Sequence, residues 1–264
     1  MARSDRWAMK RFIRIARTEL LEHRRQPWMI AIWAINYALW CALFVVGFVM
    51  IDMVAQSPVT ADSMRQQMQA LGVQFDTFIG LASSTFGSVT FTNLALFVAI
   101  TSGTSVLHDR ESGTMPFLML APVTRFQLLT GKLLGAMAIP LVMHVVFVGL
   151  SNAILVRLDT LAPVAAKFGA SPSWWVAFLI GAPASGLFVG SLGTVISALS
   201  RDVRTSMQYT SFFITILGLV FGAVLVDGIS KGLMLQLAFS AASVLGAIAI
   251  LFIGAKLIST DATS

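Results

Sequence analysis

The chain has 264 residues, of which 57% are hydrophobic and only 11% are charged. A soluble globular domain carries about 25% charged residues, and the mean hydropathy of +0.83 is far from that class. This composition excludes an ordinary soluble protein and predicts an all-α, polytopic membrane protein. The net charge of +6 is unevenly placed, so it is interpreted as a topology signal and not as affinity for nucleic acid. The single cysteine, Cys41, excludes a disulfide within the chain.

The first 27 residues form a strongly basic segment. Its eight cationic residues are Arg3, Arg6, Lys10, Arg11, Arg14, Arg17, Arg24 and Arg25. Residues 6–24 have helical periodicity, with Phe12, Ala16 and Leu20 on one face and cations on another. A basic amphipathic helix of this kind lies on the anionic inner leaflet. It is either a topology signal alone or a surface helix that also contacts a cytoplasmic subunit.

Six apolar stretches are long enough to cross a bilayer, since about 20 residues suffice for a helical span. The expected spans are Trp28–Ile51, Leu81–Leu107, Leu133–Val156, Trp174–Leu199, Ser206–Val226 and Leu233–Ile258. The predicted organisation is therefore a connecting helix in residues 1–27, a membrane domain in residues 28–258 and a polar tail in residues 259–264.

The basic residues predict the orientation of these spans. Four of the 18 Lys and Arg residues fall in the expected external segments, and the other 14 in the internal ones. The four external residues are Arg65, Arg157, Lys167 and Lys231. Because basic segments stay on the cytoplasmic side, both termini are expected in the cytoplasm. The expected location is the plasma membrane, as a bacterial inner-membrane protein.

Several expected spans contain polar or small residues. Thr90, Asn93 and Thr101 fall in the second span, where they either pack against other helices or line a translocation path. His144, in the third span, is either a hydrogen-bonded neutral imidazole or a proton relay. Small residues recur in the fourth span, where they permit close helix approach: Gly181, Gly186, Gly190 and Gly193.

The chain lacks an energy source of its own. Apart from Lys256, at the inner end of the last span, the expected spans contain no Asp, Glu, Lys or Arg, which a proton- or sodium-coupled carrier usually needs. Gly131-Lys132 lacks the earlier glycine and the following hydroxyl of a phosphate-binding loop. The three histidines and Cys41 have no metal-ligand spacing. We therefore expect no catalytic site, metal or cofactor in this chain.

The segment from residue 108 to residue 132 is charged, rich in turn residues, and lies between two apolar spans. Gly113 is expected to end the helix of the second span, and residues 114–120 to form a short apolar helix along the membrane face. Thr124 is expected to cap the next helix, and Arg125 and Lys132 to anchor it to the inner headgroups.

This segment resembles the one between spans 2 and 3 of the ABC-2 type permeases of ABC transporters. The shared pattern is Glu111-x-Gly113-Thr114, then Pro122-Val123-x-Arg125, then Gly131-Lys132, whereas Pro116 and Ala121 depart from the family. The resemblance implies a coupling helix that docks on a separate ATP-binding subunit, which would hold the ATP and Mg. The coupling residues that it implies are Glu111, Gly113, Thr114, Met115, Phe117, Leu118, Pro122, Arg125 and Lys132. Among these, Glu111 and Arg125 would make polar contacts with the partner, and Met115, Phe117 and Leu118 would fill its apolar groove.

The function expected from this resemblance is that of the membrane subunit of an ATP-driven exporter. Two permease copies, as a homodimer or a heterodimer, would pair with two ATPase subunits within membrane lipid. The alternative is an ATPase-coupled scaffold or sensor that serves a periplasmic partner without transport. A self-powered carrier or channel would be active with no ATPase present. The sequence does not specify the transported substrate.

Overall fold

The computed structural model of the chain describes residues 2–24, 27–56, 62–63, 66–67, 69–70, 75–120, 123–155, 175–214, 216–217 and 233–261. Its helices are α1 (Ala2–Arg24), α2 (Pro27–Gln56), α4 (Phe75–Glu111), α5 (Met115–Leu120), α6 (Arg125–Leu155), the π-helix η1 (Ala177–Gly181), α9 (Ala182–Leu199) and α11 (Leu233–Asp261). Residues 203–214 are also helical, and no strand occurs in the part described. The predicted all-α class is confirmed to this extent.

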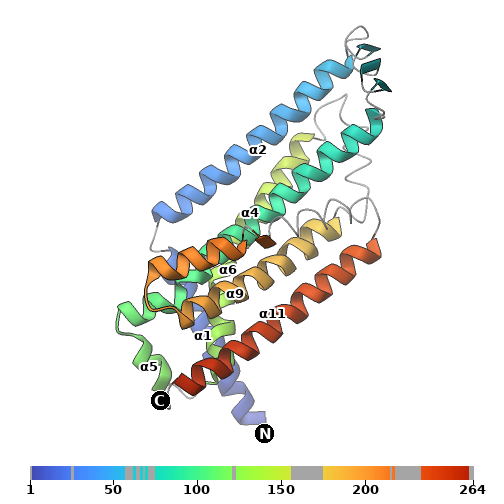
Figure 1. The fold of residues 1–264 in the computed structure, drawn as a ribbon. Coiled ribbons are helices and arrows are strands. Elements are labelled where there is room, and N and C mark those ends of the chain that lie inside the picture. The colour runs from blue at the N-terminus through green and yellow to red at the C-terminus, as the bar shows by residue number, and fades with distance from the viewer. Residues whose placement is uncertain are drawn as a thin grey trace.

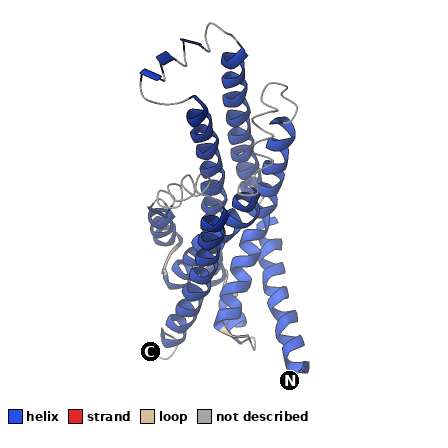
Figure 2. Ribbon diagram, turned by 90° about the vertical axis from the view of Figure 1, so that its right-hand side faces the viewer, coloured by secondary structure: helices blue, strands red, loops and turns tan. Residues whose placement is uncertain are grey.

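The long helices run side by side and alternate in direction. In Figure 1, α2 rises from the end of the bundle where α1 lies, α4 returns toward it, α6 rises again and α9 returns. The described ends of α1 and α11 lie at this same end of the bundle in both views (Figures 1 and 2), and Figure 1 shows α5 there too. We call it the terminal end.

Within the described residues, four helical stretches are long and apolar enough to cross a membrane. They are Ile30–Gly47, Arg125–Leu150, Ala177–Leu199 and Leu233–Ile258. They lie in or overlap the expected first, third, fourth and sixth spans. The expected second span lies within α4, which has 37 residues but is not among these four. Most of the expected fifth span, beyond residue 217, lies outside the described residues.

Glycines let α9 pack closely against α4. A Cβ atom added to Gly193 would lie 2.6 Å from Ser102 Oγ, and one added to Gly190 would lie 2.6 Å from Val98 Cγ1. Such distances leave no room for a side chain, so small residues are required where the two helices meet. The expectation of close approach is confirmed at Gly190 and Gly193.

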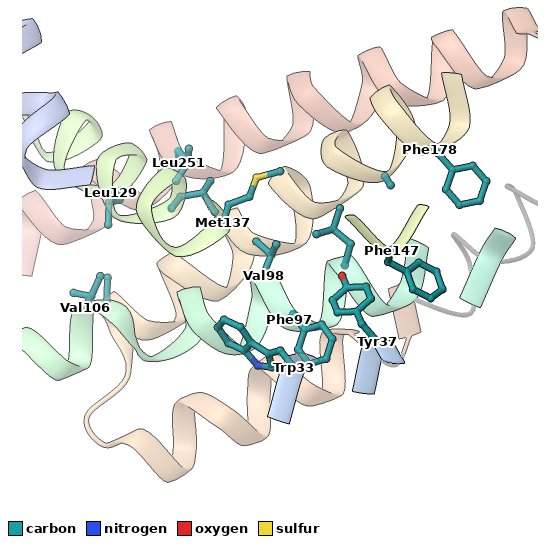
Figure 3. Close-up of a cluster of buried hydrophobic side chains, with 14 of the residues drawn as sticks. Trp33, Tyr37, Phe97, Val98, Val106, Leu129, Met137, Phe147, Phe178 and Leu251 are labelled. Atoms are coloured by element: carbon teal, nitrogen blue, oxygen red, sulfur yellow. The ribbon is translucent and has the colours of Figure 1, made fainter. Parts of the chain in front are cut away.

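An aromatic cluster joins α2 to α4 and α6. Tyr37 lies 5.3 Å from Phe97 and 5.6 Å from Phe147, measured between ring centroids, and Trp33 lies 5.7 Å from Phe97. Figure 3 shows Trp33, Tyr37 and Phe97 gathered at one side of the buried core. Aromatic rings at such separations stabilise a packing interface beyond the area that they bury. The cluster holds the first half of α2 against the bundle.

Several buried polar side chains of the bundle are hydrogen-bonded within it. Thr101 Oγ1 lies 2.9 Å from Phe97 O, and 3.2 Å from Ala136 O on α6. His144 Nε2 lies 3.1 Å from Phe178 O, and because a carbonyl only accepts, this nitrogen carries the proton. The contacts favour packing roles for Thr101 and a hydrogen-bonded imidazole for His144.

Candidate functional site

The end of α4 is a glycine-terminated turn. Gly113 has φ of +70°, a conformation that glycine adopts with little strain. Thr114 N–H donates to Asp109 O at 2.9 Å and Gly113 N–H donates to Arg110 O at 3.2 Å. These two bonds form a Schellman motif, which closes a helix C-terminus and redirects the chain. The prediction that Gly113 ends this helix is confirmed.

The short helix α5 follows directly and has two different faces. Pro116 occupies its first turn, where a missing N–H costs little. Met115 is only 7% exposed and belongs to the core, whereas Phe117 is 74% and Leu120 is 82% exposed. The predicted apolar helix over residues 114–120 is confirmed as residues 115–120. Its outward face is apolar, which is unusual for a surface that no described element of the chain covers.

The start of α6 is fixed by a capping box. Gln127 N–H donates to Thr124 Oγ1 at 3.2 Å, and Thr124 N–H donates to Gln127 Oε1 at 3.0 Å. This reciprocal pair satisfies two backbone donors that a helix N-terminus otherwise leaves unpaired. The predicted cap at Thr124 is confirmed. α5 is thus bounded by a structured turn before it and a structured helix start after it.

Beneath α5, three ionisable side chains from three helices meet inside the protein. Lys132 Nζ of α6 lies 2.6 Å from Glu19 Oε2 of α1 and 2.6 Å from Asp109 Oδ2 of α4. It also donates to Ser105 O at 3.1 Å. All three side chains are buried, with Lys132 only 4% exposed. We call this group the buried triad; its ion pairs join the three helices that surround α5.

The triad corrects one prediction. Lys132 was expected to anchor α6 to lipid headgroups, but its ammonium group lies within the protein and bonds to two carboxylates. The sequence did contain a pattern that indicates a buried role for Glu19 of the triad. Glu19 is an acid on the same face of the basic helix as Phe12 and Ala16, and an acid on an apolar face needs a buried cation.

Glycines on α6 bring α1 close enough for these ion pairs. A Cβ added to Gly135 would lie 2.5 Å from Glu19 Cβ and 2.6 Å from Ala16 O. At Gly131 it would lie 3.0 Å from Ile15 Cγ2. The two positions are four residues apart, which places them on one face of α6. Gly131 and Gly135 therefore form a flat strip on which α1 lies, a feature that the sequence analysis missed.

The environment of Glu19 favours its protonated form. Burial raises the pKa of its carboxyl to about 7, although the ammonium group of Lys132 opposes this change. Desolvation by burial is the main cause of this shift, and the nearby carboxylates of Glu22 and Asp109 add smaller contributions in the same direction. Uptake of one proton leaves a neutral group in a poorly hydrated place.

A pocket of about 440 Å³ opens between α1, α5 and the triad. Its wall includes Arg14 and Glu22 of α1, Phe117 and Leu118 of α5, and Val123. The triad residues form part of the same wall. The pocket therefore combines apolar and charged surface at the terminal end of the bundle.

Arg110 connects this region to α9. Its guanidinium donates to Ser200 O at 3.0 Å and to Ala198 O at 2.5 Å. A cation at a helix C-terminus satisfies carbonyls that lack helical partners. Just beyond, Asp202 accepts from Thr205 N–H at 2.8 Å, and hydrogen bonds from Thr205 lower the pKa of the Asp202 carboxyl. Asp202 thereby caps the helix that begins at residue 203.

The other predicted site residues fall in several places. Glu111 is exposed and Arg125 is half-buried, both at the terminal end, while Leu118 is partly buried against the core. Met115 turns inward, so it does not present the apolar surface expected of it; the sequence analysis instead missed Leu120. Pro122 lies outside the described residues.

The predicted path residues lie elsewhere in α4. Asn93 and Thr101 are buried within the bundle, and the side chain of Thr90 lies outside the description. A path past Thr101 would require α4 and α6 to separate, because its hydroxyl contacts Ala136 O. Whether these residues ever line a path stays a prediction.

Comparison with known families decides the identity of the chain. A family model described as ABC-2 family transporter protein matches residues 13–238. The match runs from within α1 into α11 and includes the whole of α4, α5 and α6. The chain belongs to the ABC-2 transporter family. A search of curated proteins finds no match.

Membership in the ABC-2 family makes this chain a membrane component of an ABC transporter and a multi-pass membrane protein. Such transporters work with an ATPase partner. The apolar outward face of α5, the pocket beside it and the buried triad below are thus parts of an ABC-2 membrane component at the end of the bundle where both termini lie.

Proposed function

We propose that the chain is the membrane subunit of an ATP-driven exporter and that α5 receives force from a separate ATPase. The observation that carries the proposal is the two-sided character of α5. Phe117 and Leu120 face outward with large exposed apolar surfaces, whereas Met115 is held in the core. A helix of this kind can bind a partner on one side and transmit displacement to the bundle on the other.

In this proposal, the buried triad and Arg110 transmit the displacement of α5 to the other helices. Through Lys132, a displacement of α5 reaches α1, α4 and α6 together, and through Arg110 it reaches the end of α9. Lys132 is therefore a positioning residue in the coupling site, and Glu111 and Arg125 are the exposed and half-buried polar groups that contact the partner.

The proposed topology has six spans with both termini and α5 in the cytoplasm of a bacterial cell. The uneven distribution of Lys and Arg supports this orientation. A single bundle does not enclose an alternating-access path, so two copies, or one copy with a homologue, pair with two ATPase subunits that bind ATP and Mg.

The decisive experiment places charge on the outward face of α5. Phe117→Glu with Leu120→Glu should preserve membrane insertion but abolish both co-purification of the ATPase and transport-linked ATP hydrolysis, because a buried interface disfavours unpaired carboxylates. Ser112→Glu, an exposed change close to α5, is the matched control and should retain both. Full ATPase stimulation in the Phe117/Leu120 variant would refute the assignment of α5.

Arg125→Glu tests the polar contacts of the same interface. It should leave insertion intact and abolish transport-linked ATPase stimulation, measured in reconstituted vesicles with the identified ATPase. ATPase stimulation without movement of any solute in such vesicles would instead favour a scaffold or sensor that uses the ATPase mechanically.

A further inference from the structure

A second pocket, also of about 440 Å³, lies next to the pocket already described beside α5. It is bordered by the end of α1, the start of α2, one face of α4 and the helix that begins at residue 203. Glu19 and Glu22 belong to the walls of both pockets. Neither the coupling contacts nor the core packing accounts for this space.

The pocket is polar at one end and aromatic at the other. On α4 its wall extends from Phe97 through Ile100 and Thr104 to His108 and Glu111. These residues share one helix face, and the 14 residue steps from Phe97 to Glu111 span about 21 Å. The polar members are at the terminal end, and the apolar ones lie deeper in the bundle.

The aromatic end combines residues of α2 and α4. Trp33 and Phe97 form its floor and are nearly inaccessible; Figure 3 shows the two rings next to each other. Trp28, at the start of α2, is 61% exposed and also belongs to the lining. Aromatic faces bind apolar groups and organic cations.

The polar end is acidic. Among the described residues, three glutamates and one histidine line the pocket, and no Lys or Arg does. The carboxylate of Glu19 is bound to Lys132. Among the described residues neither Glu22 nor Glu111 has an ion-pair partner. Two carboxylates next to aromatic faces attract a cation and repel a phosphate or carboxylate.

We propose that this pocket binds a lipophilic organic cation, with its charge near Glu22 and Glu111 and its apolar body against Trp28, Trp33 and Phe97. The volume lies in the range of small-molecule sites. A free cation fits better than a zwitterionic phospholipid, since the phosphate of a phospholipid would lie close to the same carboxylates. Glu111 belongs to both proposals, but cation binding is measured on the chain without an ATPase, so the two proposals can fail separately.

Equilibrium dialysis of the full chain in phosphatidylcholine nanodiscs tests the proposal. The probe is radiolabelled tetraphenylphosphonium, and tetraphenylborate is an anion of nearly the same size and shape. We expect saturable binding of the cation above that of empty discs, and no saturable binding of the anion. Saturable binding of both ions, or of neither, would overturn the proposal.

Variants then locate the binding. Glu22→Gln with Glu111→Gln should weaken tetraphenylphosphonium binding about tenfold or more, as loss of a close charge pair does, and Trp28→Ala should also weaken it. Asp62→Asn, an exposed change outside the pocket, should have no effect. Unchanged affinity in the double glutamine variant would place the cation elsewhere and refute the proposal.

The lipid composition distinguishes the two sources of a cationic group. The same measurement in uncharged dodecyl maltoside micelles, corrected for empty micelles, should give an unchanged dissociation constant if the pocket takes a free cation. An anionic lipid is avoided because its surface would itself concentrate the cation. A markedly tighter constant without phosphatidylcholine would show that the lipid ammonium competes, and would overturn the assignment to a free cation.

Discussion

A single ammonium group, that of Lys132, faces two carboxylates from two other helices inside the protein. An ion pair in such a place contributes little net stability, because desolvation offsets most of the attraction. Removing one partner of the pair lowers the stability strongly, because the other charge then stays buried without an opposite charge. The triad therefore serves to hold three helices in register more than to increase stability.

Lys132→Met should lower the stability of the chain by about 3–5 kcal/mol, because it leaves Glu19 and Asp109 buried without a cation. Thermal unfolding in detergent, followed by circular dichroism, measures the change. The triple variant Glu19→Gln, Asp109→Asn, Lys132→Met removes all three charges and should recover most of the loss. A Lys132→Met protein as stable as the parent would show that the triad is not formed.

Glu19 gives this region a dependence on pH. Its pKa of about 7 in the folded chain lies above its ordinary value, so between about pH 4.5 and 7 the folded state binds more protons than the unfolded state. The stability contributed by Glu19 is thus full below this window and decreases as pH rises through 7. Melting temperatures at pH 5.5 and 8 should show a larger decrease in the parent than in Glu19→Gln. Equal decreases in both proteins would contradict the raised pKa.

At the scale of elements, contact between α1 and α6 depends on the strip formed by Gly131 and Gly135. Neither glycine is needed for backbone conformation, since both lie within a regular helix. They are needed because atoms of α1 occupy the space of a side chain. Adding a single methyl group at either glycine is enough to weaken such a close contact between two helices.

Gly135→Ala should therefore destabilise the docked position of α1 by about 1–3 kcal/mol, the usual effect of overpacking. Gly149→Ala, in the same helix, is the matched control, because nothing lies within 4 Å of its added Cβ. Limited proteolysis after the arginines of α1 reports the docking. If the two variants are cut at the same rate, α1 does not lie on this strip.

The turn between α4 and α5 depends on one dihedral angle. Nothing lies within 4 Å of a Cβ added to Gly113, so Gly113→Ala tests backbone strain alone. It should cost about 1–2 kcal/mol, and Gly113→Asn should cost less because asparagine tolerates the left-handed region better. Thermal unfolding should give the order Gly, Asn, Ala. An alanine variant equal to the parent would contradict the positive φ.

At the scale of the whole molecule, the alternating helices place α5 and both described ends of the chain together (Figure 1). The distribution of basic residues predicts that this end lies in the cytoplasm. The exposed residues Ser63 and Ser112 fall in segments expected on opposite sides of the membrane.

Cysteine labelling tests this orientation in a Cys41→Ala background. Ser63→Cys should react with a membrane-impermeant maleimide in intact spheroplasts, whereas Ser112→Cys should react only after permeabilisation. The reverse pattern would show that the chain is inserted with its termini outside.

Short stretches of the sequence were sufficient to predict several features of the fold. The glycine at 113, the threonine at 124 and the small residues of α9 each act through their own backbone or their immediate neighbours, so their roles could be predicted from short stretches. Residues 114–120 were expected as a helix for the same reason. The bounds of the long helices were less predictable, because α4 and α6 continue beyond the apolar stretches that suggested them.

The contacts within the candidate site depended on distant parts of the chain. Lys132 was interpreted as a headgroup anchor because its partners, at residues 19 and 109, are remote in sequence. Met115 and Leu120 belong to one short apolar run, and only the packing of α5 distinguishes the buried residue from the exposed one.

The sequence by itself determined the membrane class, the helical fold and the family resemblance at residues 108–132, because composition, hydropathy and turn chemistry are properties of local residue order. The tertiary structure decided which charges are buried together, which face of α5 is left outward and where the two pockets lie. These depend on how α1, α4 and α6 approach one another, and that approach is set by side-chain volumes at positions far apart in the chain.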